Sequence, residues 1–447
     1  MSDVRREVRR LTKLATPVAL TQLSAMLLWT VDLLMVGRLG VTPLNAVSLG
    51  RLWVMGTTVV AMGLVFGVDP IASQAHGARD RRRLGRALLH VVTVALTSSL
   101  PLAGLFLLTG KVLLAFGQDP ATAALAHRYV VVQIPGLPFY LLFVALKQYL
   151  QARGIVRPAM WVSFAGNAFN AVLNAVLIFG LFGAPAMGAV GAGVATAVTS
   201  ALLAGGLVLV MRRARLQRGS STVLDLREVR RGELAEVLRL GAPVSLQLLF
   251  EYWAFAFATL LAGRLGAVDL AAHSIALNLA SVSYMVPLGI SLGATARVGN
   301  RIGARDPTGA RRAAWVALGL AAATMSLFAL LFVLGRRAVP AAFGAGAEVV
   351  ARAAGILPIV AAFELFDGVQ VVGGGILRGM GRPRPAALFN LIGYYALGMP
   401  LALWLGRAET WGLPGIWWGL ALGLFTVAVC VTAWIAWRGP ETVEPVV

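Results

Sequence analysis

Long apolar runs separated by short polar segments extend through almost the whole chain. A helix needs about 20 apolar residues to cross the hydrocarbon core of a bilayer, and the pattern predicts about twelve such helices. The longest polar stretch between them, 212–236, is too short for a soluble domain and is predicted to link two six-helix halves. The predicted spans lie near Leu14–Val36, Ala46–Ala72, Leu88–Thr109, Tyr129–Leu150, Met160–Leu181, Met187–Met211, Leu238–Ala262, Leu270–Ala296, Ala314–Leu334, Ala351–Leu377, Ala386–Leu405 and Leu413–Trp437.

The composition supports a membrane protein. Of the 447 residues, 58% are hydrophobic and 13% are charged, and the mean hydropathy is +0.80. A soluble domain is about 25% charged, so this chain has too few charges to cover a water-exposed surface. We therefore predict an all-α polytopic membrane protein and no soluble enzyme. The single cysteine, Cys430, excludes an intrachain disulfide.

The formal net charge of +20 comes from 39 basic and 19 acidic residues. In a soluble protein this excess would suggest nucleic-acid binding. Here the basic residues lie between apolar runs, as expected when positive charge collects in cytoplasmic loops. Most of them fall on the inner side if both termini are cytoplasmic, whereas Arg51 is assigned to an outer segment or span end. Lys147 is the basic residue placed well inside a predicted span.

The sequence contains an internal repeat. Pro17 aligns with Pro243, a shift of 226 residues, and the alignment continues through two longer motifs. Each copy holds six predicted helices, an even number, so both copies keep the same orientation, as in the parallel repeats of some transporters. We expect an N-lobe at 1–215, a cytoplasmic linker at 216–237 and a C-lobe at 238–447. The motifs are Gly37-Arg38-Leu39-Gly40 with Gly263-Arg264-Leu265-Gly266, and Gly77-Ala78-Arg79-Asp80 with Gly303-Ala304-Arg305-Asp306.

Three acidic residues inside predicted spans break this repeat. A carboxylate in a membrane helix costs a few kcal/mol and normally marks an ion or substrate pathway. With Lys147 as the one basic residue deep in a span, basic partners could neutralise at most one of the acids. We therefore predict that they couple transport to a cation. The acids Asp32, Glu251 and Asp367 align with Ala258, Ala25 and Leu142.

Further polar residues lie in the same spans. Glu364 lies one turn before Asp367 on the same helical face, and because the two carboxyls repel, one is expected to hold a proton. This arrangement suits H⁺, whereas the same oxygens would also suit Na⁺, a hard cation. Asn170 and Asn174 share one face of the fifth span and are accessory candidates, although such amides also simply bridge helices. Tyr394 and Tyr395 could line a substrate cleft or belong to packing; Asp69 has no assigned role.

No phosphate-binding loop of the Gly-x-x-x-x-Gly-Lys-Ser/Thr type occurs, so an ATP-driven pump is not indicated. A membrane enzyme would need converging His and Asp groups with a metal, and the sequence shows no such set. We expect no cofactor other than a coupling ion, and no enzymatic activity.

Several motifs resemble the multidrug and toxic compound extrusion (MATE) family, and more narrowly its NorM-type bacterial branch. They cover nearly the whole chain and are Val31–Gly37, Asn170–Asn174 with Gly180–Pro185, Glu251 ahead of Gly263–Gly266, Arg297–Asn300, Asp367–Gln370 and Leu377–Gly379.

The resemblance implies twelve helices in two lobes around a V-shaped cleft. It also implies alternating-access efflux of organic cations and amphiphilic drugs in exchange for H⁺ or Na⁺. Family cation-site positions fall on Glu251 and Asp367, and the proton-site position falls on Asp32, with Asn170 and Asn174 nearby. Glu364 departs from the family pattern.

The alternative within the same superfamily is a flippase for lipid-linked saccharides, which would favour basic groups in the cleft. The mainly acidic buried residues argue against it. We expect a multi-pass protein of the inner membrane that functions as a monomer, binds small cationic drugs and contacts lipid but no nucleic acid.

Overall fold

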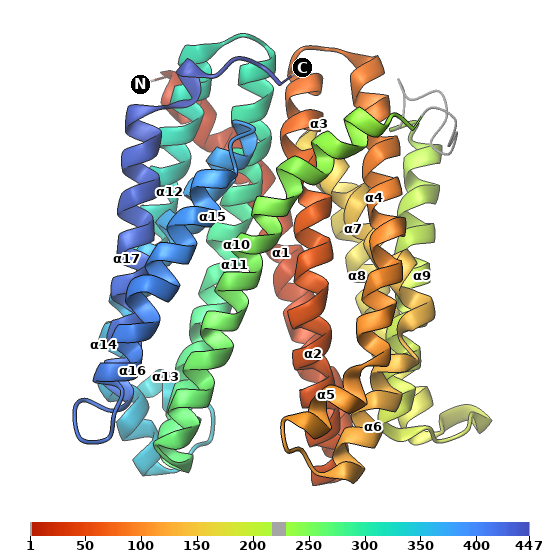
Figure 1. Cartoon of the computed structure of the whole chain (residues 1–447), viewed down its shortest axis with the longest axis vertical. Helices are drawn as coiled ribbons and strands as arrows, with labels where there is room; N and C mark the ends of the chain where they lie inside the picture. The colour runs from red at the N-terminus through yellow and green to blue at the C-terminus, as the bar shows by residue number, and fades with distance from the viewer. Residues whose placement is uncertain (1, 217–228, 447) are drawn as a thin grey trace. The chain divides into compact units, whose positions relative to one another are not determined.

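The computed structural model describes residues 2–216 and 229–446, and every regular element in these ranges is a helix (Figure 1). The first half contains α1 (Ser2–Gly37), α2 (Val41–Phe66), α3 (Val68–Gly77), α4 (Arg81–Leu107), α5 (Thr109–Ala115), α6 (Pro120–Val131), α7 (Leu137–Ala152), α8 (Arg157–Phe179) and α9 (Gly188–Arg213). The second half contains α10 (Arg231–Arg264), α11 (Ala267–Gly303), α12 (Pro307–Leu334), α13 (Ala338–Ala341), α14 (Ala347–Gly379), α15 (Arg384–Asn390), the π-helical segment η4 (Leu391–Gly398), α16 (Met399–Leu405) and α17 (Leu413–Trp437).

Within the described ranges, 12 helical stretches are long and apolar enough to cross a membrane, which confirms the predicted number and fold class. Three of them are made of more than one element: α2 with α3, α6 with α7, and α15 through α16. Most of the predicted linker, residues 217–228, lies outside the described residues. Helix α10 begins at Arg231, so the last residues of the expected linker are helical.

The duplicated Gly-Ala-Arg-Asp motif ends one helix and starts the next. Arg79 and Arg305 have left-handed φ values of 59° and 54°, which stop α3 and α11. The carboxylate that follows each of them caps the next helix: Asp80 accepts a hydrogen bond from a first-turn amide of α4 at 2.9 Å, and Asp306 does the same for α12 at 2.8 Å. Asp is among the best N-cap residues, so the repeated motif is a local stop-and-start signal.

By packing, the described chain forms two compact units. We call Leu20–Ala72 with Asp80–Ser245 the N-unit, and Met1–Ala19 with Ser73–Arg79 and Leu246–Val447 the C-unit. Two unit boundaries fall just after Pro17 in α1 and just after Pro243 in α10, at equivalent positions of the repeat. The predicted lobes coincide with the two repeat copies. The packing units differ from them, because the start of α1 belongs to the C-unit and the start of α10 belongs to the N-unit.

Ion pairs tie each exchanged segment to its unit. Glu7 of α1 is 3% exposed, and its two oxygens accept hydrogen bonds from Arg297 of α11 at 2.6 and 2.8 Å within the C-unit. Glu233 of α10 is the repeat equivalent of Glu7. In the N-unit it lies 3.0 Å from Arg86 and 3.5 Å from Arg83 of α4. Each segment therefore binds arginines from the opposite repeat.

Close packing of α14 on α11 sets the position of the C-unit site. Ser291 of α11 donates a hydrogen bond to the carbonyl of Val371 at 2.7 Å, and Thr295 donates one to the carbonyl of Gly375 at 2.8 Å. A Cβ atom at Gly375 would overlap Ser291, so glycine permits this approach. The two helices are held in fixed register just beyond the acidic positions of α14.

Candidate functional site

Three of the acidic candidates lie together in the C-unit. Glu251 comes from α10, and Glu364 and Asp367 come from α14. The Tyr284 hydroxyl donates a hydrogen bond to Glu251 at 3.3 Å, and the Ser283 hydroxyl donates one to Glu364 at 2.6 Å. Glu364 is 0% and Asp367 4% exposed. Asp367 feels the charges of both glutamates, so the three carboxyls form one electrostatic cluster.

Buried amides and a tyrosine surround these carboxyls. Gln370, one turn after Asp367, donates a hydrogen bond to the Asn390 side chain at 3.3 Å, and Tyr394 is fully buried. Buried polar atoms are normally hydrogen-bonded, and an unpaired charge there is costly. These carboxyls therefore depend on the polar side chains around them for partners. The atoms here that lack a hydrogen-bond partner within the described residues are Glu364 Oε1, Asp367 Oδ1, Gln370 Oε1, Asn390 Nδ2 and Tyr394 Oη.

A second polar network lies in the N-unit and links α1, α8 and α9. The Asn174 amide donates hydrogen bonds to Asp32 at 2.5 Å and to the Asn170 side chain at 2.9 Å. Asn170 in turn donates to the Thr199 hydroxyl at 2.8 Å. The structure thus brings together the three N-lobe residues singled out from the sequence. Thr199 was not singled out, because a threonine in an apolar span carries no signal of its own.

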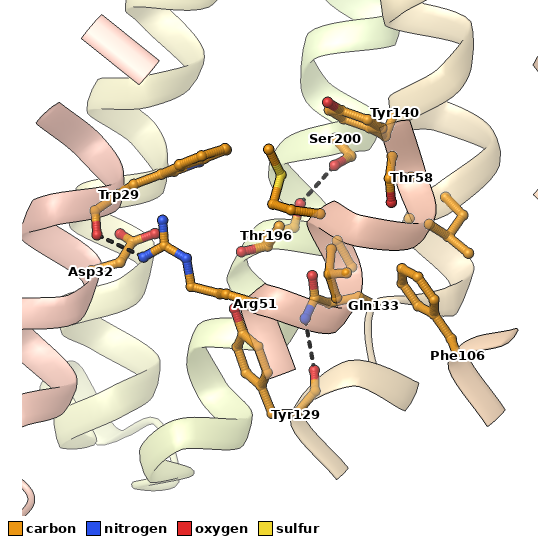
Figure 2. A pocket seen from close by; sticks show the side chains of 15 residues that line it. Trp29, Asp32, Arg51, Thr58, Phe106, Tyr129, Gln133, Tyr140, Thr196 and Ser200 are labelled. Carbon is orange, nitrogen blue, oxygen red and sulfur yellow. Dashed lines mark hydrogen bonds between the residues drawn. The ribbon is translucent and has the colours of Figure 1, made fainter. Parts of the chain in front are cut away.

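Asp32 also lines a cavity of about 120 Å³ in the N-unit (Figure 2). The cavity has room for several water molecules or a small polar group, whereas pockets for drug-sized ligands measure roughly 300–1,000 Å³. In this conformation it can hold only part of a larger molecule. Its labelled lining residues are Trp29, Asp32, Arg51, Thr58, Phe106, Tyr129, Gln133, Tyr140, Thr196 and Ser200.

Arg51 lines this cavity, which the sequence did not predict. Sequence analysis assigned it to an outer segment or span end, but it lies in α2 and its side chain lines the cavity with Asp32. Its guanidinium donates a hydrogen bond to the carbonyl of Trp29 at 2.9 Å and lies 4.9 Å from the centre of the Trp29 ring (Figure 2). The assignment to a span end did not anticipate this place in the cavity. Lys147, the basic residue placed deep in a span, lies in α7. Its Nζ lies 5.7 Å from the ring centre of Phe143.

The remaining candidates have different surroundings. Asp69 at the start of α3 is buried and accepts a hydrogen bond from Gln148 at 3.0 Å. Tyr394 packs against Phe255 with ring centres 6.2 Å apart, close enough to the acidic cluster to feel its charges. Tyr395 is 38% exposed and donates a hydrogen bond to the carbonyl of Phe250 at 3.1 Å. The two tyrosines therefore face different environments.

Comparison with known proteins agrees with this arrangement. The MatE family model matches residues 17–176 and again 243–404, so the two matches begin at equivalent prolines of the repeat. A probable multidrug resistance protein NorM of Bradyrhizobium diazoefficiens is 37% identical over 93% of this chain and 90% of that protein. The multidrug and toxin extrusion protein 1 of Oryctolagus cuniculus is 34% identical over 98% and 76% of the two chains.

Solved structures share the fold. The crystal structure of the eukaryotic MATE transporter AtDTX14 covers 98% of this chain and 98% of its own, with a TM-score of 0.90 and 25% sequence identity. This chain therefore has the fold of a known MATE transporter. The chain belongs to the MatE family, the multidrug and toxic compound extrusion family, as its motifs indicate.

Proposed function

We propose that this chain is a cation-coupled antiporter that exports organic cations and amphiphilic drugs by alternating access. The observation that carries the proposal is the pair of carboxylate sites, one in each unit, at positions where the other repeat copy has apolar residues. The relatives' printed names, which describe multidrug resistance and extrusion, support the same substrate class.

The C-unit cluster is the proposed coupling site. A carboxylate there binds a cationic drug more strongly when it is charged and free, and an incoming cation weakens that binding by neutralising it. The hydroxyls of Tyr284 and Ser283 donate hydrogen bonds to Glu251 and Glu364, and so orient these carboxyls for a proton or cation. Each net charge moved through 100 mV supplies about 2.3 kcal/mol, so the potential helps to drive the exchange when more positive charge enters than leaves.

Of the two candidate coupling ions, H⁺ is the one we propose. Each buried carboxyl can take up one proton separately, whereas Na⁺ would have to use Glu251 and Asp367 together with neutral oxygens.

The flippase alternative predicts a basic cleft. The two sites hold Asp32, Glu251, Glu364 and Asp367, so acidic groups outnumber the basic ones found beside them, and this balance favours cationic cargo. We further propose an inner-membrane location with both termini cytoplasmic and a functional monomer, because basic residues collect in the segments that this orientation places inside.

Efflux of ethidium from proteoliposomes tests the proposal. A pH gradient and a Na⁺ gradient are imposed separately on the wild type, Glu251→Gln and Asp32→Asn. We expect efflux under the pH gradient, and its loss in Glu251→Gln at normal protein levels. Full efflux by folded Glu251→Gln would refute the proposed coupling site, and no efflux under either gradient would refute the function.

A further inference from the structure

Two opposite charges of the N-unit cavity break the repeat at the same place. Asp32 and Arg51 both line the cavity, and their equivalents in the second repeat copy are Ala258 and Leu277. A charged side chain within a membrane helix is costly, so the pair needs a use that offsets this cost. The two side chains could simply neutralise each other's charge. A closed ion pair would be the simplest way to do so.

The geometry is not that of a closed ion pair. Within the described residues, no hydrogen bond or ion pair joins Asp32 to Arg51, although the guanidinium is near enough for its charge to act on the carboxylate. Asp32 is held through Oδ1 by Asn174, and Arg51 is held by the Trp29 carbonyl. Figure 2 shows the guanidinium beside the Asp32 carboxylate and below the Trp29 ring.

The Arg51 guanidinium occupies a position that is favourable for an organic cation. A cation in a partly desolvated site is stabilised by a carboxylate and by the face of an indole ring. The Arg51 guanidinium engages both features at once, through its charge near Asp32 and its place 4.9 Å from the Trp29 ring centre. The second repeat copy keeps an aromatic residue, Phe255, at the position of Trp29 but lacks both charges.

We propose that Arg51 is a tethered cation that competes with the cargo for Asp32 and Trp29, and so sets the affinity of the N-unit site for organic cations. The inference rests on the proposed function. When cargo is absent, the guanidinium balances the Asp32 charge. When a cationic group enters, the two cations share one carboxylate, which keeps the cargo weakly bound and allows its release. Arg51 acts through Asp32 and is a positioning residue.

The test measures ethidium binding by fluorescence to purified full-length protein, with correct folding checked by thermal unfolding. In Arg51→Gln we expect the Kd to fall by about tenfold, the size of effect expected when one nearby unit charge is removed in partly hydrated surroundings. Arg51→Lys keeps the charge but not the planar guanidinium, and should bind ethidium with a Kd within about threefold of the wild type, because the charge sets most of the competition. In the Asp32→Asn background, Arg51→Gln should lower the Kd by less than about threefold, because the carboxylate being competed for is gone and only the contact with the Trp29 ring and the repulsion between the two cations remain.

A second measurement covers the case in which Arg51→Gln folds poorly. In Arg51→Ala, which leaves space for a small ion, added guanidinium chloride at low millimolar concentration should compete with ethidium, whereas in the wild type it should not. A structural role through the Trp29 contact would change the unfolding temperature without this competition.

Three outcomes overturn the inference. They are an unchanged or raised Kd in folded Arg51→Gln, a tightening of the Kd that is just as large in the Asp32→Asn background, and no competition by guanidinium in Arg51→Ala. If instead the wild type neither binds ethidium nor transports it under any gradient, the proposed function fails as well. If the wild type transports ethidium but any of the three outcomes occurs, the tethered-cation role alone fails.

Discussion

Neutralising Glu7 should destabilise the C-unit. This side chain is 3% exposed and accepts two hydrogen bonds from Arg297, at 2.6 and 2.8 Å, while Arg301 lies 3.8 Å away. Removing one partner of a fully buried ion pair costs about 3–5 kcal/mol. The arginine side chains are 16% and 29% exposed, so water screens part of the loss. We expect Glu7→Gln to cost about 2–3 kcal/mol.

The equivalent residue of the other repeat copy provides a matched control. Glu233 is 17% exposed and sits between Arg83 and Arg86, so its neutralisation should cost about 1 kcal/mol, since more exposed pairs contribute less. Thermal unfolding in detergent, followed by near-UV circular dichroism, measures both variants. Because 1 kcal/mol lowers the Tm by roughly 2–4 °C in a unit of this size, Glu7→Gln should unfold several degrees below the wild type and below Glu233→Gln. Unfolding of Glu7→Gln at the wild-type temperature would refute the reasoning.

Three further predictions concern the helices around the sites. Gly375→Ala should lower both the Tm and ethidium efflux because a Cβ would overlap Ser291, whereas Gly355→Ala on the same helix meets open space and should be neutral in a thermal melt. Glu364→Gln keeps an acceptor for its hydroxyl partner but loses a charge, so gradient-driven efflux should fall by about tenfold with ethidium binding retained; unchanged efflux rates would exclude a coupling role. Asp80→Ala removes the N-cap of α4 and should cost about 1 kcal/mol in a thermal melt; an unchanged Tm would contradict that cap.

The fold could be predicted because the signals for each helix lie within its own segment of the sequence. Each span is recognisable by an apolar run that is long enough to cross a membrane. The duplicated Gly-Ala-Arg-Asp motif ends one helix and caps the next, as Asp80 and Asp306 show. The acidic candidates could be found by the same logic, because a carboxylate in an apolar helix stands out and the repeat shows that symmetry does not require it.

Other features depend on contacts between distant segments. Glu7 and Arg297 are far apart in sequence, and nothing near either residue indicates that the start of α1 packs with the second repeat copy. Arg51 looked like a residue at a span end because long side chains can reach the interface, but its guanidinium lies with Asp32 in the cavity. The apolar pattern also did not predict the π-helical segment that contains Tyr394 and Tyr395.

The central claim is that cation movement and drug movement are coupled through the buried carboxylates. The most direct measurement imposes an outward ethidium gradient on proteoliposomes without any ion gradient and follows lumenal pH and Na⁺ with fluorescent indicators. The account predicts that ethidium leaving the vesicles drives protons inward and acidifies the lumen, and that Glu251→Gln abolishes this signal. Ethidium efflux without movement of either ion would contradict the account.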